Sequence, residues 1–485
     1  MKDIILTTIN AKWIHPSLAL RLLKANLGAL EDRCEIIEFA LRQPLCEKTE
    51  PLLAANPQIL GISVSIWNHL ATIELLKELN KSWTEETKPV VVLGGPEVSF
   101  LPFDAEIFYY ADYVICGEGE NAFRVLCETL LAEAGELTTR LLTQKFSKFI
   151  PAEPVNLSEI KSAYHLYSND DLEKKLVYVE ASRGCLFNCE FCLSAVKTEN
   201  SEQKKENRVR EFPVDMFLSE MDILIQRGVK TFKFLDRTFN SNIKRALYIM
   251  DFFLKKIEER KEAGQPLVVH FEMTASLFLP ELLDKLRLFP SGSLRLEIGI
   301  QTLNKETASH IGRIINPEKE LEALRFLREK TNAIIHVDLI AGLPGEDIIS
   351  FGKGFDRLWT ALCIEEAFPL PDNQAAFNSG HIEIQLGILK LLPGALISRH
   401  NDSFSMSYNK LPPYDIEESS SMSVDDLKRI KNFARFWEII VNRGLIKITY
   451  KPVFNSFLDL SDKLFAHFGR NWGIDKSELL AFLSL

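Results

Sequence analysis

Three closely spaced cysteines suggest the first chemistry of this chain. Cys185, Cys189 and Cys192 follow a C-x-x-x-C-x-x-C spacing, and Phe191 stands just before the last of them. Cysteine thiolates at close local spacings are typical ligands of iron–sulfur clusters. Three thiolates can hold three irons of a cubane cluster and leave the fourth iron open to a small molecule. The spacing therefore predicts a catalytic [4Fe–4S] site rather than a site that only carries electrons.

A zinc site and a disulfide framework fit these cysteines less well. Structural zinc usually takes four ligands, often from paired C-x-x-C motifs, and the sequence holds no second pair. Eight cysteines are few for 485 residues, whereas disulfide frameworks are typical of short secreted chains. The isolated cysteines, which we expect to be core or surface thiols, are Cys34, Cys46, Cys116, Cys127 and Cys363.

The bulk properties predict a cytoplasmic protein of two or three domains. The hydrophobic fraction of 46% and the charged fraction of 26% are ordinary for a globular chain. A net charge of −10 argues against sequence-independent nucleic-acid binding, and no nucleic-acid-binding module is evident. The start of the chain resembles a strand rather than a signal peptide. No stretch reaches the ~18 apolar residues that suggest a membrane span, and an oxygen-sensitive cluster needs a reducing compartment.

The first 135 residues alternate strands and helices. Continuous apolar strands separated by helices predict a parallel sheet covered on both faces, here a five-stranded doubly wound domain. The expected strands are Ile4–Ile9, Glu35–Phe39, Ile59–Ser63, Val90–Leu93 and Tyr113–Cys116. The expected helices are Pro16–Leu30, His69–Trp83 and Asn121–Leu131.

Four loops of this domain follow strand ends, where doubly wound domains bind their ligands. Glycines in two of these loops would let the backbone approach a bulky ligand closely. The alternative interpretation is that Gly and Pro only mark the ends of the strands. The candidate ligand-contacting residues in the four loops are Trp13, His15, Ser63, Val64, Trp67, Asn68, Gly94, Gly95, Pro96, Glu97, Gly117, Glu118, Gly119 and Glu120.

The second half alternates as well and predicts a six-unit partial barrel, with chemistry at the carboxyl ends of its strands. The expected strands are Leu176–Glu180, Thr231–Leu235, Leu267–Met273, Leu294–Ile300, Ile334–Ile340 and Ile382–Ile388. The expected helices are Val214–Arg227, Ile243–Glu262, Glu281–Leu288, Lys305–Lys330 and Ile348–Leu362. We expect the charged stretch Lys197–Arg210 to be a mobile loop and Ala367–Gly380 to serve structure or partner contact.

The chain ends in a region of different character. Ser423 is a suitable N-cap for a helix that begins after it. The apolar residues that follow have the spacing of an amphipathic helix: Val424, Leu427, Ile430, Phe433, Phe436 and Trp437. These aromatic residues are expected to be core rather than a cofactor site. The segment Phe454–Leu485 is apolar and predicted to be helical, so the last residues would form a cap that can choose the substrate.

Two parts of this pattern resemble one known family. The cluster loop resembles that of radical S-adenosylmethionine (SAM) enzymes, and the four strand-end loops resemble those of a cobalamin-binding domain. The chain over about residues 1–395 is thus similar to the cobalamin-binding radical SAM enzymes. The resemblance implies an α/β fold: a doubly wound five-stranded cobalamin-binding domain over 1–135, a linker over 136–175, a partial (β/α)6 radical SAM barrel over 176–395 and a mostly helical C-terminal cap over 396–485.

The resemblance also implies roles for single residues. Cys185, Cys189 and Cys192 would ligate the [4Fe–4S] cluster, and the strand-end candidates above would contact cobalamin. Many cobalamin proteins carry Asp-x-His-x-x-Gly, whose His ligates cobalt, but here Trp13 stands in the Asp position and Leu18 in the Gly position. We therefore expect His15 to cap the Pro16 helix or line the pocket, and the loop of Trp67 and Asn68 to cover the lower cobalt face.

SAM contacts are implied at several strand ends of the barrel. The sequence departs from the family at Asp236, where a Gly-Gly-Glu-like motif is usual, and at Asp338, where the first Gly of G-x-I-x-G-x-x-G-E is usual. A buried acid must be paired, so structural salt bridges could equally explain Glu272 and Glu297. The implied SAM-binding residues are Phe191, Asp236, Asn240, Glu272, Glu297, Gln301, Ile340 and Gly342.

The family then implies an activity. Cluster-bound SAM is cleaved to a 5′-deoxyadenosyl radical, which abstracts hydrogen from an unactivated carbon. The substrate radical takes a methyl group from methylcobalamin, so a cobalamin-dependent methyltransferase is the main interpretation. A rearrangement or oxidative cyclisation without methyl transfer, and a cobalamin- or metal-binding regulator without turnover, remain alternatives. An external electron donor such as flavodoxin or ferredoxin is implied, and the small-molecule or peptide substrate is unknown.

Overall fold

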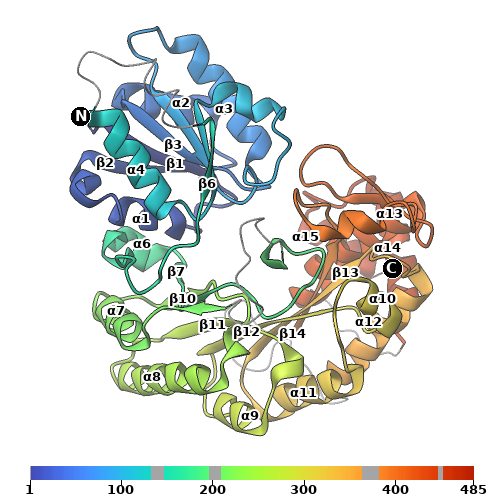
Figure 1. Cartoon of the computed structure of the whole chain (residues 1–485). Coiled ribbons are helices and arrows are strands. Elements are labelled where there is room, and N and C mark those ends of the chain that lie inside the picture. The colour runs from blue at the N-terminus through green and yellow to red at the C-terminus, as the bar shows by residue number, and fades with distance from the viewer. Residues whose placement is uncertain (1, 133–146, 196–208, 363–381, 446–451, 485) are drawn as a thin grey trace. The chain divides into compact units, whose positions relative to one another are not determined.

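The computed structural model describes residues 2–132, 147–195, 209–362, 382–445 and 452–484. The chain divides into two compact units (Figure 1), one formed by Met1–Ala181 with Arg210–Lys233 and the other by Ser182–Val209 with Phe234–Leu485. Cys363, the loop Ala367–Gly380 and all but the last two residues of the loop Lys197–Arg210 lie outside the described residues. Within the described ranges, no helix has the length and apolar character needed to cross a membrane.

The first unit contains a parallel sheet with the strand order β2-β1-β3-β4-β5-β6. Its strands are β1 (Ile4–Asn10), β2 (Cys34–Ala40), β3 (Ile59–Ser63), β4 (Val90–Gly94), β5 (Tyr113–Gly117) and β6 (Phe149–Ala152). The predicted doubly wound parallel sheet is confirmed, with one strand more than expected. The order reverses between β1 and β3, and ligands of such sheets bind at this switch point.

The added strand β6 lies in the segment that was expected to be a linker. It pairs with β5, and Pro151 stands opposite Cys116 in the register. Proline cannot donate to a strand ladder and is therefore confined to positions such as edge strands. Since β6 is an edge strand, Pro151 is compatible with the sheet.

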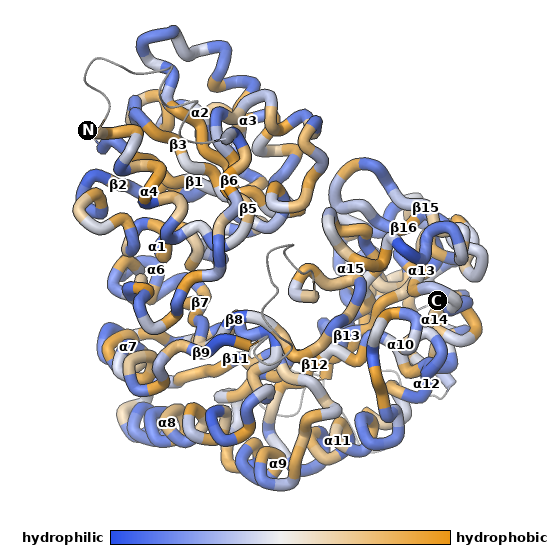
Figure 2. The backbone as a smooth tube through the Cα atoms, in the orientation of Figure 1, coloured by the Kyte–Doolittle hydropathy of each residue, from blue (hydrophilic) through white to orange (hydrophobic). Residues whose placement is uncertain are grey.

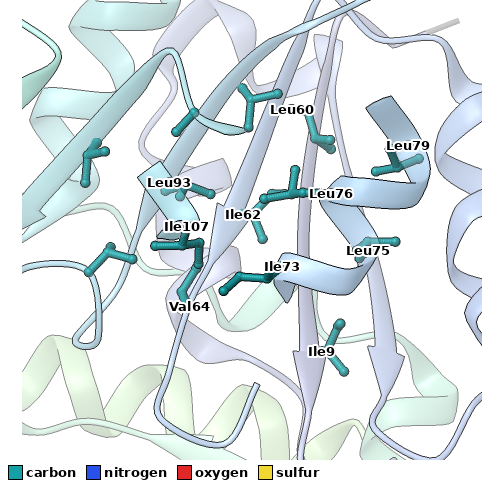
Figure 3. Packing of buried hydrophobic residues seen from close by; sticks show 14 of the residues in the cluster. Ile9, Leu60, Ile62, Val64, Ile73, Leu75, Leu76, Leu79, Leu93 and Ile107 are labelled. Atoms are coloured by element: carbon teal, nitrogen blue, oxygen red, sulfur yellow. The ribbon is translucent and has the colours of Figure 1, made fainter. Parts of the chain in front are cut away.

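Helices cover both faces of this sheet and bury two separate apolar cores. On one face, α2 (Leu45–Ala55) contributes Leu52 to the core. On the same face, α3 (His69–Ser82) packs Leu76 against the strands (Figure 3). On the other face, α1 (Leu18–Ala25) and α4 (Gly119–Ala132) contribute Leu20 and Phe123. Helix α2, which carries Pro51 in its interior, was not among the expected helices.

The second sheet has the strand order β14-β13-β12-β11-β10-β7. Its strands are β7 (Val177–Val179), β10 (Thr231–Phe234), β11 (Val268–Met273), β12 (Leu294–Gln301), β13 (Ile334–Ala341) and β14 (Ile382–Ile388). Along β12 every second residue is fully buried, and the residues between them are only partly buried. The parallel register places Glu272 beside Glu297 and Gly299 beside Asp338. One face of β11, β12 and β13 therefore carries the polar side chains.

The helices of the second unit follow these strands with one difference from expectation. The predicted helix over residues 305–330 is two helices, because Gly312 adopts a φ of +69° and Pro317 occupies a first-turn position of the next helix. Along α8, hydrophilic and hydrophobic segments alternate (Figure 2), as expected for a helix with one buried face. The helices are α8 (Ile243–Glu262), α9 (Pro280–Leu286), α10 (Lys305–His310), α11 (Pro317–Lys330) and α12 (Ile348–Leu362).

The C-terminal region packs helices on the edge of the second sheet. Ser423 and Asp426 form a capping box at the start of the first helix, as predicted. Phe433 and Trp437 stack with ring centroids 5.6 Å apart and are fully buried, so the aromatic residues are core. The Asn442 side chain bonds both backbone groups of Ile384 in the edge strand β14. The elements are α13 (Val424–Trp437), the π-helix η9 (Glu438–Asn442), α14 (Phe454–Phe468) and α15 (Lys476–Leu483).

Candidate active site

The three predicted cluster cysteines line one cavity of about 230 Å³ in the second unit. A turn brings two of them together, because the N–H of Cys192 donates to the carbonyl of Cys189 at 2.9 Å. Cys185 lies with its sulfur 3.3 Å from the hydroxyl of Thr238. Cys189 is buried and the other two are partly exposed. The loop therefore presents three soft sulfur donors to a single cavity, which is the donor chemistry that an iron–sulfur cluster requires.

The cysteines do not converge on one point. Over the described part of the chain, no three His, Cys, Asp or Glu side chains are arranged as ligands of a single metal ion. A cubane cluster does not need such convergence, because each cysteine binds a different iron.

Acidic and basic groups from several strand ends complete the cavity wall. Glu272 belongs to β11, Glu297 and Gln301 belong to β12, and Phe191 belongs to the cluster loop, so four predicted SAM contacts meet here. Glu272 and Glu297 lie on the polar face of the sheet and are only partly buried. The residues that line the cavity without having been predicted as contacts include Arg237, Thr238, Thr274, Gly299, Arg313 and Asp338.

Four other predicted SAM contacts do not line this cavity. Asp236 is 2% exposed and accepts a hydrogen bond from Ser182 at 2.5 Å. The amide of Asn240 bonds both backbone groups of Thr274 at 3.0 Å, so Asn240 supports the cavity wall from behind. A side chain at Gly342 would lie 2.6 Å from Ile416. The fourth residue, which also lies away from the cavity lining, is Ile340.

Arg313 is one of the lining residues that were not expected from the sequence. Its Nη2 donates to the carbonyl of Gly299 at 2.9 Å, and its Nη1 lies 3.6 Å from the sulfur of Cys189. Burial raises the pKa of the Cys189 thiol, and the guanidinium opposes this by favouring the thiolate. The Gly312 and Pro317 signals of a helix break could have indicated that Arg313 lies in a turn rather than on a helix face.

A buried carboxyl supports the turn that follows β13. Glu346 is 2% exposed and accepts a hydrogen bond from the Thr302 hydroxyl at 2.7 Å. Burial raises the pKa of Glu346 from 4.5 to about 7. Burial likewise raises the pKa of Glu320 on α11 to about 7. Both groups bind protons more tightly in the folded state than in the unfolded chain.

We expect Glu346→Gln to reduce the pH dependence of stability. A carboxyl group whose pKa is raised by folding contributes stability that is fully present below pH 4.5. This stability is lost as the pH rises through about 7. The wild type should therefore be more stable at pH 5 than at pH 8. Glu346 should account for at most roughly 3 kcal/mol of this difference in the free energy of unfolding. Urea unfolding at both pH values measures this share. Glu322→Gln, which changes an exposed acid on α11, is the control and should unfold like the wild type. An equal pH dependence in wild type and Glu346→Gln would contradict the expectation.

In the first unit, one buried amide ties the loop after β3 to strand β1. Asn68 is 0% exposed, and its Nδ2 donates to Thr8 Oγ1, the Ile9 carbonyl and the Ser63 carbonyl at 3.0–3.3 Å. Its Oδ1 accepts from the Ser65 N–H at 2.8 Å. All its hydrogen-bonding groups are used inside the protein. Asn68 therefore shapes the switch point instead of reaching a ligand as a side chain.

The loop after β4 lies against the loop after β3. The N–H of Val64 donates to the Gly94 carbonyl at 2.8 Å, and Gly95 has a φ of +107°. A Cβ at Gly95 would lie 2.5 Å from the Val64 carbonyl oxygen, so only glycine fits this close approach. Glu97, one residue beyond exposed Pro96, is buried and pairs with His69 at 2.8 Å.

The remaining cobalamin candidates differ in how accessible they are. Trp13 and Trp67 are each about half exposed. His15 does not cap α1, because Ser17 is the cap, and its Nδ1 lies 2.8 Å from the hydroxyl of Tyr178.

The loop after β5 is largely engaged inside the first unit. Gly117 lies against Ala152 of β6, and Glu118 binds Arg210 and the N–H of Val155. Gly119 begins α4, and Glu120 beside it is buried.

Comparison with known proteins finds two families, one for the part of the chain with the cluster cysteines and one for the N-terminal sheet. A family model described as the radical SAM superfamily matches residues 179–356, and one described as the B12 binding domain matches residues 4–127. The chain is a cobalamin-binding radical SAM enzyme. The radical SAM domain implies a [4Fe–4S] cluster and SAM, and the B12-binding domain implies cobalamin, so the predicted family and cofactors are confirmed.

Two curated relatives of this radical SAM enzyme are methyltransferases by name. The uncharacterized methyltransferase PH0819 of Pyrococcus horikoshii is 27% identical over 335 residues, which is 65% of this chain and 68% of the relative. The cobalamin-dependent radical SAM methyltransferase TokK of Streptomyces tokunonensis is 25% identical over 330 residues, which is 63% of this chain but only 45% of TokK.

A solved structure shares the fold. OxsB, a cobalamin-dependent SAM radical enzyme solved with aqua-cobalamin and SAM bound, superposes with a TM-score of 0.62 at 17% identity. The superposition covers 99% of this chain and 74% of OxsB. At this identity the likeness concerns the fold alone.

Proposed function

We propose that this radical SAM enzyme transfers a methyl group to an unactivated carbon of its substrate. The observation that carries the proposal is the set of three cysteines on one cavity whose wall also holds carboxylates and an arginine, in a chain that has a B12-binding domain. The matching relatives named as methyltransferases favour methyl transfer over the alternatives. The cluster supplies the electron for reductive cleavage of SAM, and cobalamin supplies the methyl group.

The chain's own residues bind and orient these groups. Cys185, Cys189 and Cys192 would hold the [4Fe–4S] cluster, which would supply the site for SAM. Arg313 lies beside Cys189 and provides the positive charge that the SAM carboxylate requires, in a planar fork suited to carboxylates.

The carboxylates of the wall take the other part of SAM. Glu272, Glu297 and Asp338 stand on neighbouring strands of the polar face, where they can accept hydrogen bonds from the ribose hydroxyls and the amine. Gln301 adds an amide on the same wall.

The loops of the B12-binding domain hold the corrin by shape. Gly94 and Gly95 present backbone without side chains, and Trp13 and Trp67 present half-exposed apolar surface at the β1 and β3 ends. His15 is engaged with Tyr178, which supports the expectation that it does not ligate cobalt. We place the enzyme in the cytoplasm with flavodoxin or ferredoxin as electron donor, because the cluster needs a reducing compartment.

The test is anaerobic reconstitution with iron, sulfide and hydroxocobalamin, followed by reduction in the presence of SAM. We expect 5′-deoxyadenosine and S-adenosylhomocysteine together, because methyl transfer consumes one SAM as radical source and another as methyl donor. With substrate, the product should gain one CH₂.

5′-Deoxyadenosine without S-adenosylhomocysteine in the presence of substrate would favour a rearrangement or cyclisation. Neither product from a protein that binds both cofactors would favour a regulator without turnover.

A further inference from the structure

A buried carboxylate lies inside the cluster loop itself. Glu190 stands between Cys189 and Phe191, and only 5% of its surface is exposed. Its Oε1 accepts a hydrogen bond from the guanidinium of Arg399, and its Oε2 lies 3.0 Å from Nε2 of His400. A buried charge is costly unless it is paired. Arg399 and His400 therefore offset the free-energy cost of burying the Glu190 carboxylate in the cluster loop.

Both backbone groups of Glu190 are tied to distant segments as well. Its N–H donates to the Ile311 carbonyl at 3.1 Å, and its carbonyl accepts from the Ile397 N–H at 2.9 Å. Ile397 belongs to the short helix η8 (Leu396–His400), which also carries both side-chain partners of the acid. We call Glu190, Arg399 and His400 the Glu190 clamp. The clamp joins the cluster loop to η8 through backbone and side chains together.

The turn whose Ile311 carbonyl accepts the hydrogen bond from the Glu190 N–H also contains Arg313. A Cβ at Gly312 would lie 2.8 Å from the Asn188 carbonyl oxygen, so this turn rests directly on the cluster loop. Arg313 follows at once and reaches the sulfur of Cys189. A displacement of the loop from this turn would change the distance between the cluster cysteine and the arginine.

Contacts around the clamp extend to the turn after β13. His310 lies with Nδ1 3.1 Å from the Pro344 carbonyl oxygen and packs on Phe404 with ring centroids 4.9 Å apart. The His400 ring lies 5.8 Å from the same Phe404 ring. A Cβ at Gly345 would meet both Phe404 and His310 at 3.1–3.2 Å, so the packing leaves no free space. The cluster loop and the turn after β13 thus share one tightly packed support.

We propose that Glu190 is a positioning residue which, through Arg399 and His400, holds the cluster loop at the distance from Arg313 that SAM needs to bind the open iron. The proposal rests on the proposed function, because it assumes a cluster in the loop and SAM beside it. Groups behind the direct ligands orient them, and their loss typically weakens metal sites about 10–100-fold. The clamp acts through the loop and touches no reacting atom.

Arg399→Ala and Glu190→Gln are the test variants. The Arg399 side chain is 63% exposed, so its removal leaves no cavity and the variant should fold. Glu190→Gln keeps the shape of the side chain and removes its charge. The control is Arg429→Ala, which breaks the ion pair with Asp462 on the cap of the same unit.

Two quantities are measured on each reconstituted protein. The first is the rate at which an iron chelator removes the cluster. The second is the Kd of SAM from its effect on the electron paramagnetic resonance signal of the reduced cluster, compared at equal cluster content. We expect both test variants to lose iron about 10-fold or more faster and to bind SAM at least about 10-fold more weakly, with wild-type values in Arg429→Ala.

The outcomes separate the two proposals. Wild-type iron loss and wild-type SAM affinity in both test variants would overturn the positioning role. Faster iron loss with unchanged SAM affinity at equal cluster content would also overturn it, because the clamp would then only stabilise the loop. A wild-type protein that assembles no cluster, or whose signal does not respond to SAM, would refute the proposed function instead.

Discussion

Cys189→Ala will yield a folded protein that holds no stable [4Fe–4S] cluster and forms no 5′-deoxyadenosine from SAM. Cys189 is the buried member of the three, and its sulfur lies beside Arg313. Alanine offers no soft donor, and a serine oxygen cannot replace a thiolate at iron of this kind. The loss should therefore be complete in iron and sulfide content and in SAM cleavage, measured after anaerobic reconstitution.

Cys46→Ala is the matched control. Cys46 is an exposed free cysteine of the first unit, and its loss should leave cluster content and SAM cleavage at the wild-type level. Wild-type cluster content in Cys189→Ala would show that the cluster has other ligands. Zinc in place of iron in the wild-type protein would require the three cysteines to be interpreted as part of a zinc site.

Gly95→Val will abolish tight binding of cobalamin. A residue with a side chain at a φ of +107° is strained by roughly 1–3 kcal/mol, and its Cβ would collide with the Val64 carbonyl. The loops after β3 and β4 must then separate, which breaks the bond from the Val64 N–H to the Gly94 carbonyl. Equilibrium dialysis with hydroxocobalamin should show a Kd raised at least about 10-fold, since loss of positioning contacts costs that much at comparable sites.

One glycine variant of the same unit serves as a control, and a second variant tests the same loop. Gly28→Ala also lies at positive φ, but its Cβ would meet only Arg124 at 3.8 Å, so cobalamin binding should be retained. Gly94→Ala adds a methyl group whose nearest neighbour is a carbonyl at 3.8 Å. It should fold normally and bind cobalamin more weakly if the corrin rests on this backbone. Unchanged binding in both Gly95→Val and Gly94→Ala would place cobalamin away from these loops.

The local features of the fold were accessible from sequence because they repeat at short range. All five expected strands of the first unit are present, and the Ser423 cap begins its helix as expected. Errors fell where local signals conflicted with tertiary context. Pro151 lies in the expected linker but belongs to an edge strand, and the Gly312 break was hidden within an otherwise helical pattern.

The sequence by itself determined the donor set, because three cysteines within eight residues are brought together by their own loop whatever the rest of the chain does. Only the tertiary structure decided which other side chains accompany them. Arg313 joins the cavity, whereas Asn240 turns away to bond Thr274. The pairing of Glu190 with Arg399 likewise joins residues far apart in the chain. Such contacts depend on strand order, register and the packing of turns, and the spacing of residues along the chain carries no record of these.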